Sequence, residues 1–112
     1  MNLNVRVVLS DRRDLGAPLS LLEESLRAGE PVPEAFAELL AEAVERKDLE
    51  VLTATAGEHV VGAAVLAYRL NIASGGLFAS LEDLYVIPEA RRRSVGRALM
   101  AAVQQRCKAR NV

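Results

Sequence analysis

The amino-acid sequence predicts a mixed α/β domain in which helices flank a largely antiparallel sheet. The order of the sequence patterns leads to this fold class. A first β-branched run is followed by two runs with helical spacing of apolar residues, then by three strand-like runs, and then by one more helical run. The expected order of elements is therefore β-α-α-β-β-β-α. We find no internal repeat and no linker that divides the sequence, so residues 1–112 are expected to form a single domain.

The first half of the chain is expected to hold one strand and two helices. Residues 3–9 are β-branched and apolar, which predicts a strand. Leucines spaced three and four apart predict a short amphipathic helix over residues 18–28. Pro33 suits the first turn of a second helix. The apolar stripe of that helix is expected to consist of Phe36, Leu39, Leu40, Ala43 and Val44.

The second half is expected to hold a hairpin, a third strand and a last helix. Residues 49–56 and 59–68 are separated by two residues, as in a hairpin with a tight turn. The second of these strands is apolar on both faces, which indicates a central position in the sheet. Residues 77–87 form another expected strand, which Pro88 ends. The last helix is expected over residues 94–110, with Ser94 as its N-cap.

Composition restricts the kind of protein and its partners. Apolar residues make up 51% of the chain and charged residues 26%, which are the proportions of a folded globular protein. The formal net charge of −1 offers no general attraction to nucleic acid or to an anionic membrane. A single cysteine, Cys107, fits a reducing compartment. We therefore expect a cytoplasmic protein with no nucleic-acid or membrane partner.

Charge is distributed unevenly along the chain. Residues 14–50 contain ten carboxylates and three basic residues, whereas residues 91–112 contain seven basic residues and no acid. Such runs are often the solvated surfaces of helices. The functional interpretation is a cationic substrate near the acidic region and a polyphosphate near the basic region.

Residues 81–100 form the segment to which we assign chemistry. A strand runs there into a short loop with three arginines and then into a helix whose first turn contains Gly96 and Ala98. Small residues let a ligand approach the backbone, and a helix N-terminus offers amide groups and a partial positive charge. Four arginines add full charges: Arg91, Arg92, Arg93 and Arg97. These features predict a pyrophosphate-binding site.

This segment resembles the acetyl-CoA signature of the GNAT N-acetyltransferase family, R/Q-x-x-G-x-G/A. Arg93, Gly96 and Ala98 match the signature, and the preceding residues LYVIPEARR resemble the strand and bend that lead into it. The order of the other elements, with VVG in the third strand, also follows the family. The resemblance covers nearly the whole chain, although the family normally continues with further strands and a helix. The chain is therefore expected to be C-terminally short relative to the family.

Two residues depart from the family pattern, since Arg92 and Ser94 stand where the family often has glycine. We expect a stiffer and more crowded loop, with Ser94 compensating by capping the helix or by donating to a phosphate. The expected consequence is an altered affinity for the cosubstrate.

The resemblance implies acetyl-CoA as the cosubstrate and assigns its contacts. Backbone groups of Leu84, Tyr85 and Val86 would hold the pantetheine arm and point an N–H at the thioester carbonyl, a contribution of about 3 kcal/mol in comparable enzymes. The amides of the first helical turn would meet the pyrophosphate. The full set of implied cosubstrate-binding residues is Leu84, Tyr85, Val86, Arg91, Arg92, Arg93, Ser94, Val95, Gly96, Arg97 and Ala98.

An amine acceptor must lose a proton before it attacks, because an alkylamine with a pKa near 10 is mostly charged at neutral pH. Glu82 is the preferred base, since it lies in an LED triplet that resembles the strand of spermidine/spermine-type acetyltransferases in which a glutamate acts through water. Strand alternation sends Glu82 and Asp83 to opposite faces. If a bulge interrupts that alternation, Asp83 is the alternative base, with Glu82 still preferred.

The function implied by the resemblance is acetyl-CoA-dependent transfer of an acetyl group to a primary amine of a small molecule or protein. The alternative is a catalytically incomplete module that binds coenzyme A or regulates. A nucleic-acid patch has little support, because no stacking aromatics lie among the arginines. We expect no metal site. A homodimer is a further expectation, since a second copy would pair the open edge of the sheet.

Overall fold

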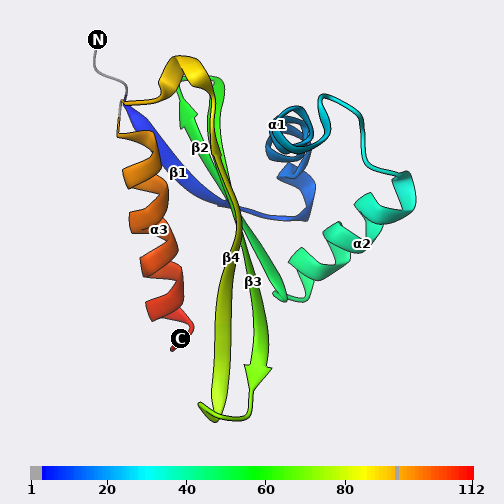
Figure 1. Ribbon diagram of the computed structural model, residues 1–112, viewed down its shortest axis with the longest axis vertical. Helices are drawn as coiled ribbons and strands as arrows, with labels where there is room; N and C mark the ends of the chain where they lie inside the picture. The colour runs from blue at the N-terminus through cyan, green and yellow to red at the C-terminus, as the bar shows by residue number, and fades with distance from the viewer. Residues whose placement is uncertain (1–3, 93) are drawn as a thin grey trace.

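The computed structural model describes residues 4–92 and 94–112 and has a twisted antiparallel sheet with helices on both faces (Figure 1). The predicted fold class and order of elements are confirmed. The strands are β1 (Val5–Ser10), β2 (Leu49–Ala56), β3 (His59–Asn71) and β4 (Gly76–Val86), and the helices are α1 (Gly16–Arg27), α2 (Glu34–Glu45) and α3 (Val95–Ala109), with short 3-10 helices η1 (Arg12–Asp14) and η2 (Pro88–Ala90). Within the described residues, no helix is long and apolar enough to cross a membrane.

The four strands lie in the order β1-β2-β3-β4, and each pairs antiparallel with its neighbours. The β2–β3 hairpin was predicted with the correct boundaries on both sides of its turn, where Gly57 adopts a left-handed φ of 62°. The interior position predicted for β3 is also confirmed, because β2 and β4 flank it. Strand β4 lies at one edge of the sheet, so half of its backbone hydrogen-bonding groups point away from β3.

Helix α3 covers one face of the sheet alone (Figure 1). Its buried side chains Val95, Leu99 and Val103 pack in one core with residues of β2 and β3 such as Leu52 and Leu66. Leu99 has no exposed surface and Val95 is 1% exposed. The first turn of α3 is thus fixed against the sheet.

Gly62 explains how closely α3 approaches β3. A Cβ atom at this position would lie 3.0 Å from Leu99 Cδ1, 3.0 Å from the carbonyl oxygen of Tyr85 and 3.2 Å from Val95 Cγ1. These separations are shorter than ordinary van der Waals contacts, so any larger residue would push α3 away from the sheet. The glycine of the VVG sequence therefore sets the position of the helix N-terminus.

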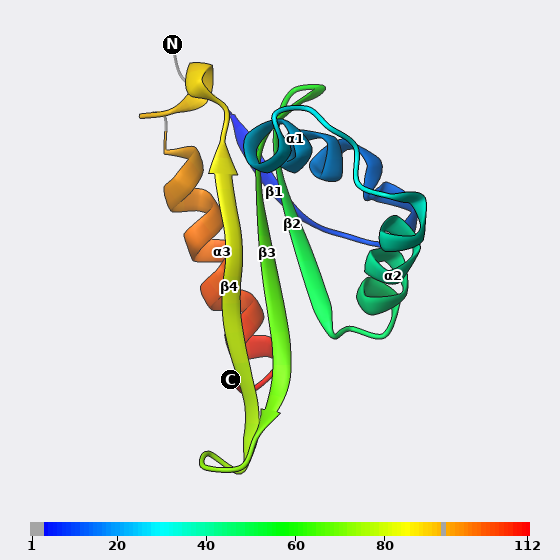
Figure 2. The same cartoon turned by 45° about the vertical axis from the view of Figure 1, so that its right-hand side comes forward.

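Helices α1 and α2 lie on the opposite face (Figure 2), over a smaller core. Leu15, Leu22 and Val44 pack there against Val51 and Val65. The predicted apolar stripe of α2 is wrong in part. Phe36 is 49% exposed and Leu39 61% exposed, because α2 contacts the sheet mainly through its last turns.

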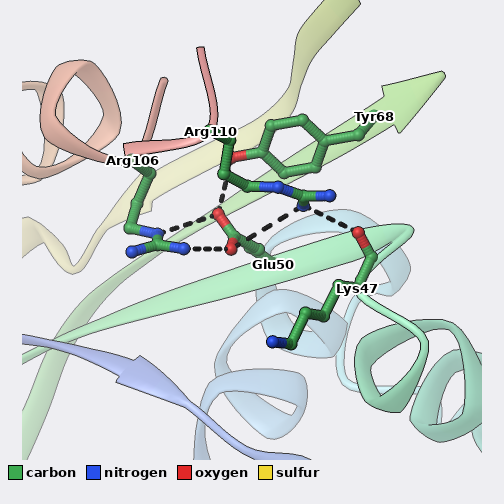
Figure 3. A network of polar contacts seen from close by, with 5 residues as sticks. All are labelled: Lys47, Glu50, Tyr68, Arg106 and Arg110. Atoms are coloured by element: carbon green, nitrogen blue, oxygen red, sulfur yellow. Dashed lines mark hydrogen bonds and ion pairs between the residues drawn. The ribbon is translucent and has the colours of Figure 1, made fainter. Parts of the chain in front are cut away.

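A buried polar network ties the C-terminal end of α3 to the sheet (Figure 3). The Glu50 carboxylate is 4% exposed and accepts hydrogen bonds from Arg106 at 3.0 and 2.6 Å and from the Tyr68 hydroxyl at 2.5 Å. Arg110 lies 3.8 Å from the same carboxylate, donates to the Lys47 carbonyl at 2.7 Å, and stacks 3.9 Å from the Tyr68 ring centroid. The network satisfies a carboxylate that would otherwise be costly to bury.

Candidate functional site

The site predicted from the sequence lies where β4 ends and α3 begins. The chain leaves β4, passes through η2 and enters α3 at one end of the molecule, as Figures 1 and 2 show from two directions. Helix α3 then runs back along the sheet, so its C-terminal network lies away from this end. The edge strand and the helix N-terminus therefore adjoin, which is the arrangement that the proposed cosubstrate site requires.

Strand β4 has an irregularity at Glu82. In the register with β3, Asp83 lies opposite Val65 and Leu81 lies opposite Leu66, so Glu82 has no residue opposite it. A β-bulge bends the strand and interrupts the alternation of its side chains. This is the circumstance for which Asp83 was the alternative to Glu82 as the base.

The bulge brings the two acids to one face of the sheet. Asp83 lies opposite Val65, and Ser80 lies opposite Ala67, so Asp83 and Ser80 share the face that α1 and α2 cover. The Ser80 hydroxyl donates to the Glu82 carboxylate at 2.5 Å, which turns the Glu82 side chain toward the same face. The expectation that the two acids point to opposite faces is therefore wrong, because it assumed an unbroken strand.

Backbone groups at the end of β4 point to the open edge. The amide of Ile87 donates to the carbonyl of Val61 at 2.9 Å, so Ile87 points toward β3. Alternation along an antiparallel strand then directs the groups of Val86 and Leu84 to the edge. Arg91 supports this arrangement, because its Nε donates at 3.0 Å to the carbonyl of Val86 from outside the sheet. The edge thus presents the amides of Leu84 and Val86, two of the three predicted residues of this strand.

Tyr85 is the predicted residue of this strand that does not point to the open edge. Its side chain is half-buried against the core beneath α1, and the Arg91 guanidinium lies 5.5 Å from its ring centroid. Arg91 is therefore held against β4 by one hydrogen bond and one cation–π contact. Of the predicted arginines, it is the one that supports the strand.

The loop before α3 adopts two left-handed backbone conformations. Arg92 has φ of 64° and Ser94 has φ of 67°, which are the positions where glycine would be less strained. Ser94 was expected to cap the helix with its side chain. Ser94 does occupy the predicted N-cap position, but the expectation for its side chain is wrong, because the hydroxyl makes no capping hydrogen bond. The Ser94 carbonyl bonds to the helix instead, accepting from the Ala98 amide at 3.0 Å.

The first turn of α3 presents backbone and charge to solvent. A Cβ atom built on Gly96 meets nothing within 4 Å, so the helix surface there is open. Arg92 and Arg97 are exposed, and neither makes an ion pair with a described residue. Arg93 lies outside the described residues. The donors of the first helical turn, together with two exposed guanidinium groups, fit a polyphosphate.

The amides predicted to meet the pyrophosphate are not equivalent. Val95 is anchored in the core by its side chain and Gly96 is open to solvent, whereas the Ala98 amide already donates to Ser94 within the helix. The geometry therefore favours the start of the turn over its end as the anion site.

A pocket of about 300 Å³ opens on the α1 and α2 face beside the acid pair. Its walls come from both helices and from the sheet, and Asp83 is the residue that β4 contributes. Apolar residues of the wall include Leu15, Leu22, Leu26, Phe36, Val51 and Val65. This volume lies at the lower end of the range for small-molecule sites, about 300 to 1,000 Å³.

Other chemically active residues lie away from this region. His59 is exposed beside the β2–β3 turn, and Cys107 is half-buried against the α3 core. Burial and the hydrogen bond to Glu50 raise the pKa of Tyr68 far above its ordinary value, so this hydroxyl is held protonated in a structural role.

Three features of the structure were not identified from the sequence. The role of Gly62 as a spacer, the apolar pocket and the Glu50 network all depend on contacts between distant segments. A signal existed for the network, since a glutamate within an apolar strand and two arginines four residues apart on one helix predict a buried ion pair. No comparable local pattern indicated the pocket.

Comparison with known proteins agrees with this geometry. Residues 18–112 match the family described as Acetyltransferase (GNAT) family. No curated protein sequence matches the chain. Solved structures with the same fold include an aminoglycoside acetyltransferase, meta-AAC0020, from an uncultured soil metagenomic sample, with a TM-score of 0.81, 20% identity, and coverage of 96% of this chain and 72% of that one.

Two further solved structures extend the comparison. An integron cassette protein from the mobile metagenome of Cole Harbour Salt Marsh has a TM-score of 0.83 and 26% identity, with 95% of this chain and 72% of that chain covered. A predicted acetyltransferase from Clostridium acetobutylicum, solved with acetyl-CoA, has a TM-score of 0.78 and 14% identity, with 96% and 76% covered. Since the family match spans most of the chain and the fold agrees, the chain belongs to the GNAT acetyltransferase family.

Proposed function

We propose that residues 1–112 act as one acetyl-CoA-dependent N-acetyltransferase domain that acetylates a primary amine of a small molecule or protein. One observation carries the proposal. Strand β4 is followed, after a short loop, by the open helix N-terminus at Gly96. The strand presents edge amides near its end and, at its bulge, two carboxylates beside a pocket. These features support an anion site, an edge for the thioester carbonyl and a base within about fifteen residues of chain.

The residues fit the proposed cosubstrate in two places. The pyrophosphate would lie over the start of α3, where a side chain at Gly96 would stand in its way. The pantetheine arm would run along the open edge beside Leu84 and Val86, pairing with their backbone amides as an added strand does. Of the predicted set, Arg91 would act by holding the strand end, and Arg92 and Arg97 would supply charge.

Acetyl-CoA supplies an activated acetyl group, and the chain supplies binding, orientation and a proton acceptor. The ammonium of the acceptor first gives one proton to a carboxylate. The nitrogen lone pair then forms the bond to the acetyl carbon, the C–S bond breaks, and the second proton goes to the sulfur of the departing coenzyme A. Holding the two substrates in one orientation provides much of the expected rate gain.

Two carboxylates are candidates for the proton acceptor. Glu82 is the proposed base from the resemblance, and its contact with Ser80 holds it at the bulge. Asp83 lines the pocket, which supports it as the group that meets the amine first. We therefore propose that the base is one of this pair, with Asp83 favoured by the bulge.

The cosubstrate part is tested by thermal unfolding with and without acetyl-CoA. At about 100 times the Kd, binding should stabilise the folded chain by about 2.7 kcal/mol. Gly96→Asp should abolish that increase, because it places a carboxylate where the pyrophosphate would bind. Gly16→Asp is the matched control, since Gly16 also lies in the first turn of a helix with nothing within 4 Å of its Cβ position. A wild-type protein that acetyl-CoA does not stabilise would contradict the proposal.

Catalysis is tested by release of coenzyme A in the presence of a panel of primary amines. Asp83→Asn should lower kcat/KM by on the order of 100-fold if it is the base, and Glu82→Gln should do so if that residue is. Stabilisation by acetyl-CoA without release from any amine would instead support the catalytically incomplete coenzyme A-binding module. Equal, small losses in both variants would contradict a base within this pair.

The proposal also covers the cellular location, the partners and the assembly of the protein. Cys107 as the single cysteine and the net charge of −1 support a cytoplasmic enzyme without nucleic-acid or membrane partners. The part of the β4 edge away from Leu84 and Val86 supports a homodimer in which a second copy lies along it. A mass measurement of the assembled protein tests the dimer, and a monomer at all concentrations would contradict it.

A further inference from the structure

We infer that the acceptor is a primary amine carried on an apolar body, such as an alkylamine or an arylalkylamine, and that polycations are poor acceptors. The inference rests on the proposed function and identifies its substrate class. It follows from what lines the pocket beside the acid pair, and from what several carboxylates of the acidic region contact.

The walls of the pocket are mostly apolar. Nine of its twelve lining residues are leucine, valine or phenylalanine. They come from both helices and from the sheet, so an occupant is surrounded by hydrocarbon on several sides. Leu26 and Phe36 are 60% and 49% exposed without an occupant, which leaves apolar surface for a ligand to cover.

Two of the three charged lining residues are engaged in holding the α1–α2 connection. The Glu23 carboxylate accepts from the amide of Val32 at 2.7 Å. The Arg27 Nε donates to the carbonyl of Glu30 at 3.0 Å, and its guanidinium lies 3.9 Å from the Glu30 carboxylate. Among the described residues, Asp83 has no hydrogen bond or ion pair to its carboxylate, so it is the charge that the pocket offers to an ammonium.

The acidic residues of α2 do not extend this site. Glu38 and Glu45 both pair with Arg12 at 2.9 Å, and neither lines the pocket. The carboxylate that the pocket offers to a cation is therefore Asp83 of β4, which lies outside the acidic region of residues 14–50. A polyamine or an aminoglycoside carries several ammonium groups, and burying the others among leucines without partners is unfavourable.

A single carboxylate at one end of an apolar pocket fits one ammonium at one end of an apolar chain. Each methylene that enters the pocket should improve transition-state binding by two- to fourfold, as expected from about 0.8 kcal/mol for a fully buried CH₂. The gain should stop when the cavity of about 300 Å³ is filled. A chain-length series therefore reports on the pocket directly.

The experiment measures coenzyme A release with unbranched primary amines from two to eight carbons, phenethylamine, spermidine and an aminoglycoside, at saturating acetyl-CoA. We expect kcat/KM to rise with chain length and to exceed that for both polycations at least tenfold. Leu26→Gln should flatten the series. Leu39→Gln is the matched control and should leave it unchanged, because Leu39 is 61% exposed and lies outside the pocket.

The outcomes separate this inference from the proposed function. Release with spermidine or the aminoglycoside as the best acceptor, or a series that does not depend on chain length, overturns the inference while the acetyltransferase proposal stands. No release with any amine contradicts the proposed function itself. A series that Leu26→Gln and Leu39→Gln change equally also overturns the inference, since the pocket would then not be where the apolar chain binds.

Discussion

The two faces of the sheet differ in how completely they are packed. On the α3 face, Leu99 and Val95 are fully buried and a polar network fixes the far end of the helix. On the opposite face, α1 and α2 leave a pocket and expose Phe36 and Leu39. The comparison indicates a division of roles. Under the proposed function, the closely packed face would hold the helix N-terminus in place for an anion, and the open face would leave room for an acceptor.

The two sides of the sheet also differ in how far their ion pairs are buried. On the α3 face, Glu50 is 5% exposed at its side chain and pairs with Arg106. On the α2 side, Arg12 pairs with Glu38 and Glu45, each 63% exposed. Charges that are buried must remain paired, whereas exposed pairs contribute little. An ion pair is therefore needed for stability on the α3 face, whereas the ion pairs on the α2 side contribute almost nothing to stability.

The largest expected difference comes from truncating one leucine on each face. Leu99→Ala should lower the free energy of unfolding by about 3 to 5 kcal/mol, because it leaves a cavity in a filled core. Leu22→Ala should cost about 2 kcal/mol or less, since Leu22 already borders the pocket and loses fewer contacts. Urea unfolding of both variants measures the difference. Equal costs would contradict the contrast in packing.

Removing one arginine from each ion-pair set should give the next largest effect. Arg106→Leu should destabilise the fold by about 2 to 4 kcal/mol, because Glu50 stays buried with only Arg110 and Tyr68 near it. Arg12→Leu should cost less than about 1 kcal/mol, since both of its partners are exposed. Similar losses in the two variants would argue against a structural role for the network.

The pH dependence of stability should report on Glu50. Burial alone would raise its pKa, but hydrogen bonds from Arg106 and Tyr68 outweigh burial and lower the pKa of Glu50 below its usual value. A carboxyl with a lowered folded-state pKa stabilises the fold above its unfolded pKa of about 4.3, and this contribution is lost as pH falls through the folded pKa. Glu50→Gln should reduce the loss of stability on acidification. A variant that loses as much stability on acidification as the wild type would contradict this assignment.

A smaller effect is expected from adding one methyl group at each of two glycines. Gly62→Ala should destabilise the protein by about 1 to 3 kcal/mol, because the new Cβ would lie 3.0 Å from Leu99 and from a backbone oxygen. Gly16→Ala lies at the start of α1 with open space around it and should be neutral or stabilise by up to about 1 kcal/mol. Thermal melts distinguish the two, and a neutral Gly62→Ala would show that α3 shifts freely.

The smallest expected change comes from restoring glycine in the loop before α3. Arg92 and Ser94 both have left-handed backbone angles, so Ser94→Gly should relieve strain and stabilise the fold by at most about 1 kcal/mol. Ser94→Ala should be neutral or mildly destabilising, because the hydroxyl makes no capping bond. A loss of about 1 kcal/mol in Ser94→Ala would instead indicate that the hydroxyl caps the helix.

Much of the fold was predictable because local patterns carry it. The hairpin boundaries at Ala56 and His59, the central position of β3 and the extent of α3 all follow from periodicity and turn residues. The bulge at Glu82 was not predictable, since nothing in the local sequence distinguishes it from a regular strand. For the same reason, the relative positions of Glu82 and Asp83 were predicted incorrectly.

The site was predictable where it depends on consecutive residues and not where distant segments meet. Gly96 and the arginines adjoin one another along the chain, so their sequence already indicates an anion site. The pocket requires α1, α2 and three strands to converge. Phe36 belongs to the predicted apolar stripe of α2, and it lines this pocket with about half of its surface exposed. Long-range packing decides such features, and a single sequence contains no local signal for it.

The central claim is that the two faces bind two different substrates, and one kinetic comparison tests it most directly. The KM for acetyl-CoA and the KM for an apolar amine are measured in Gly96→Asp and in Leu26→Gln. The account predicts that Gly96→Asp raises the KM for acetyl-CoA at least tenfold with little change for the amine, and that Leu26→Gln raises the KM for the amine alone. Both variants raising the same constant would contradict the division between the faces.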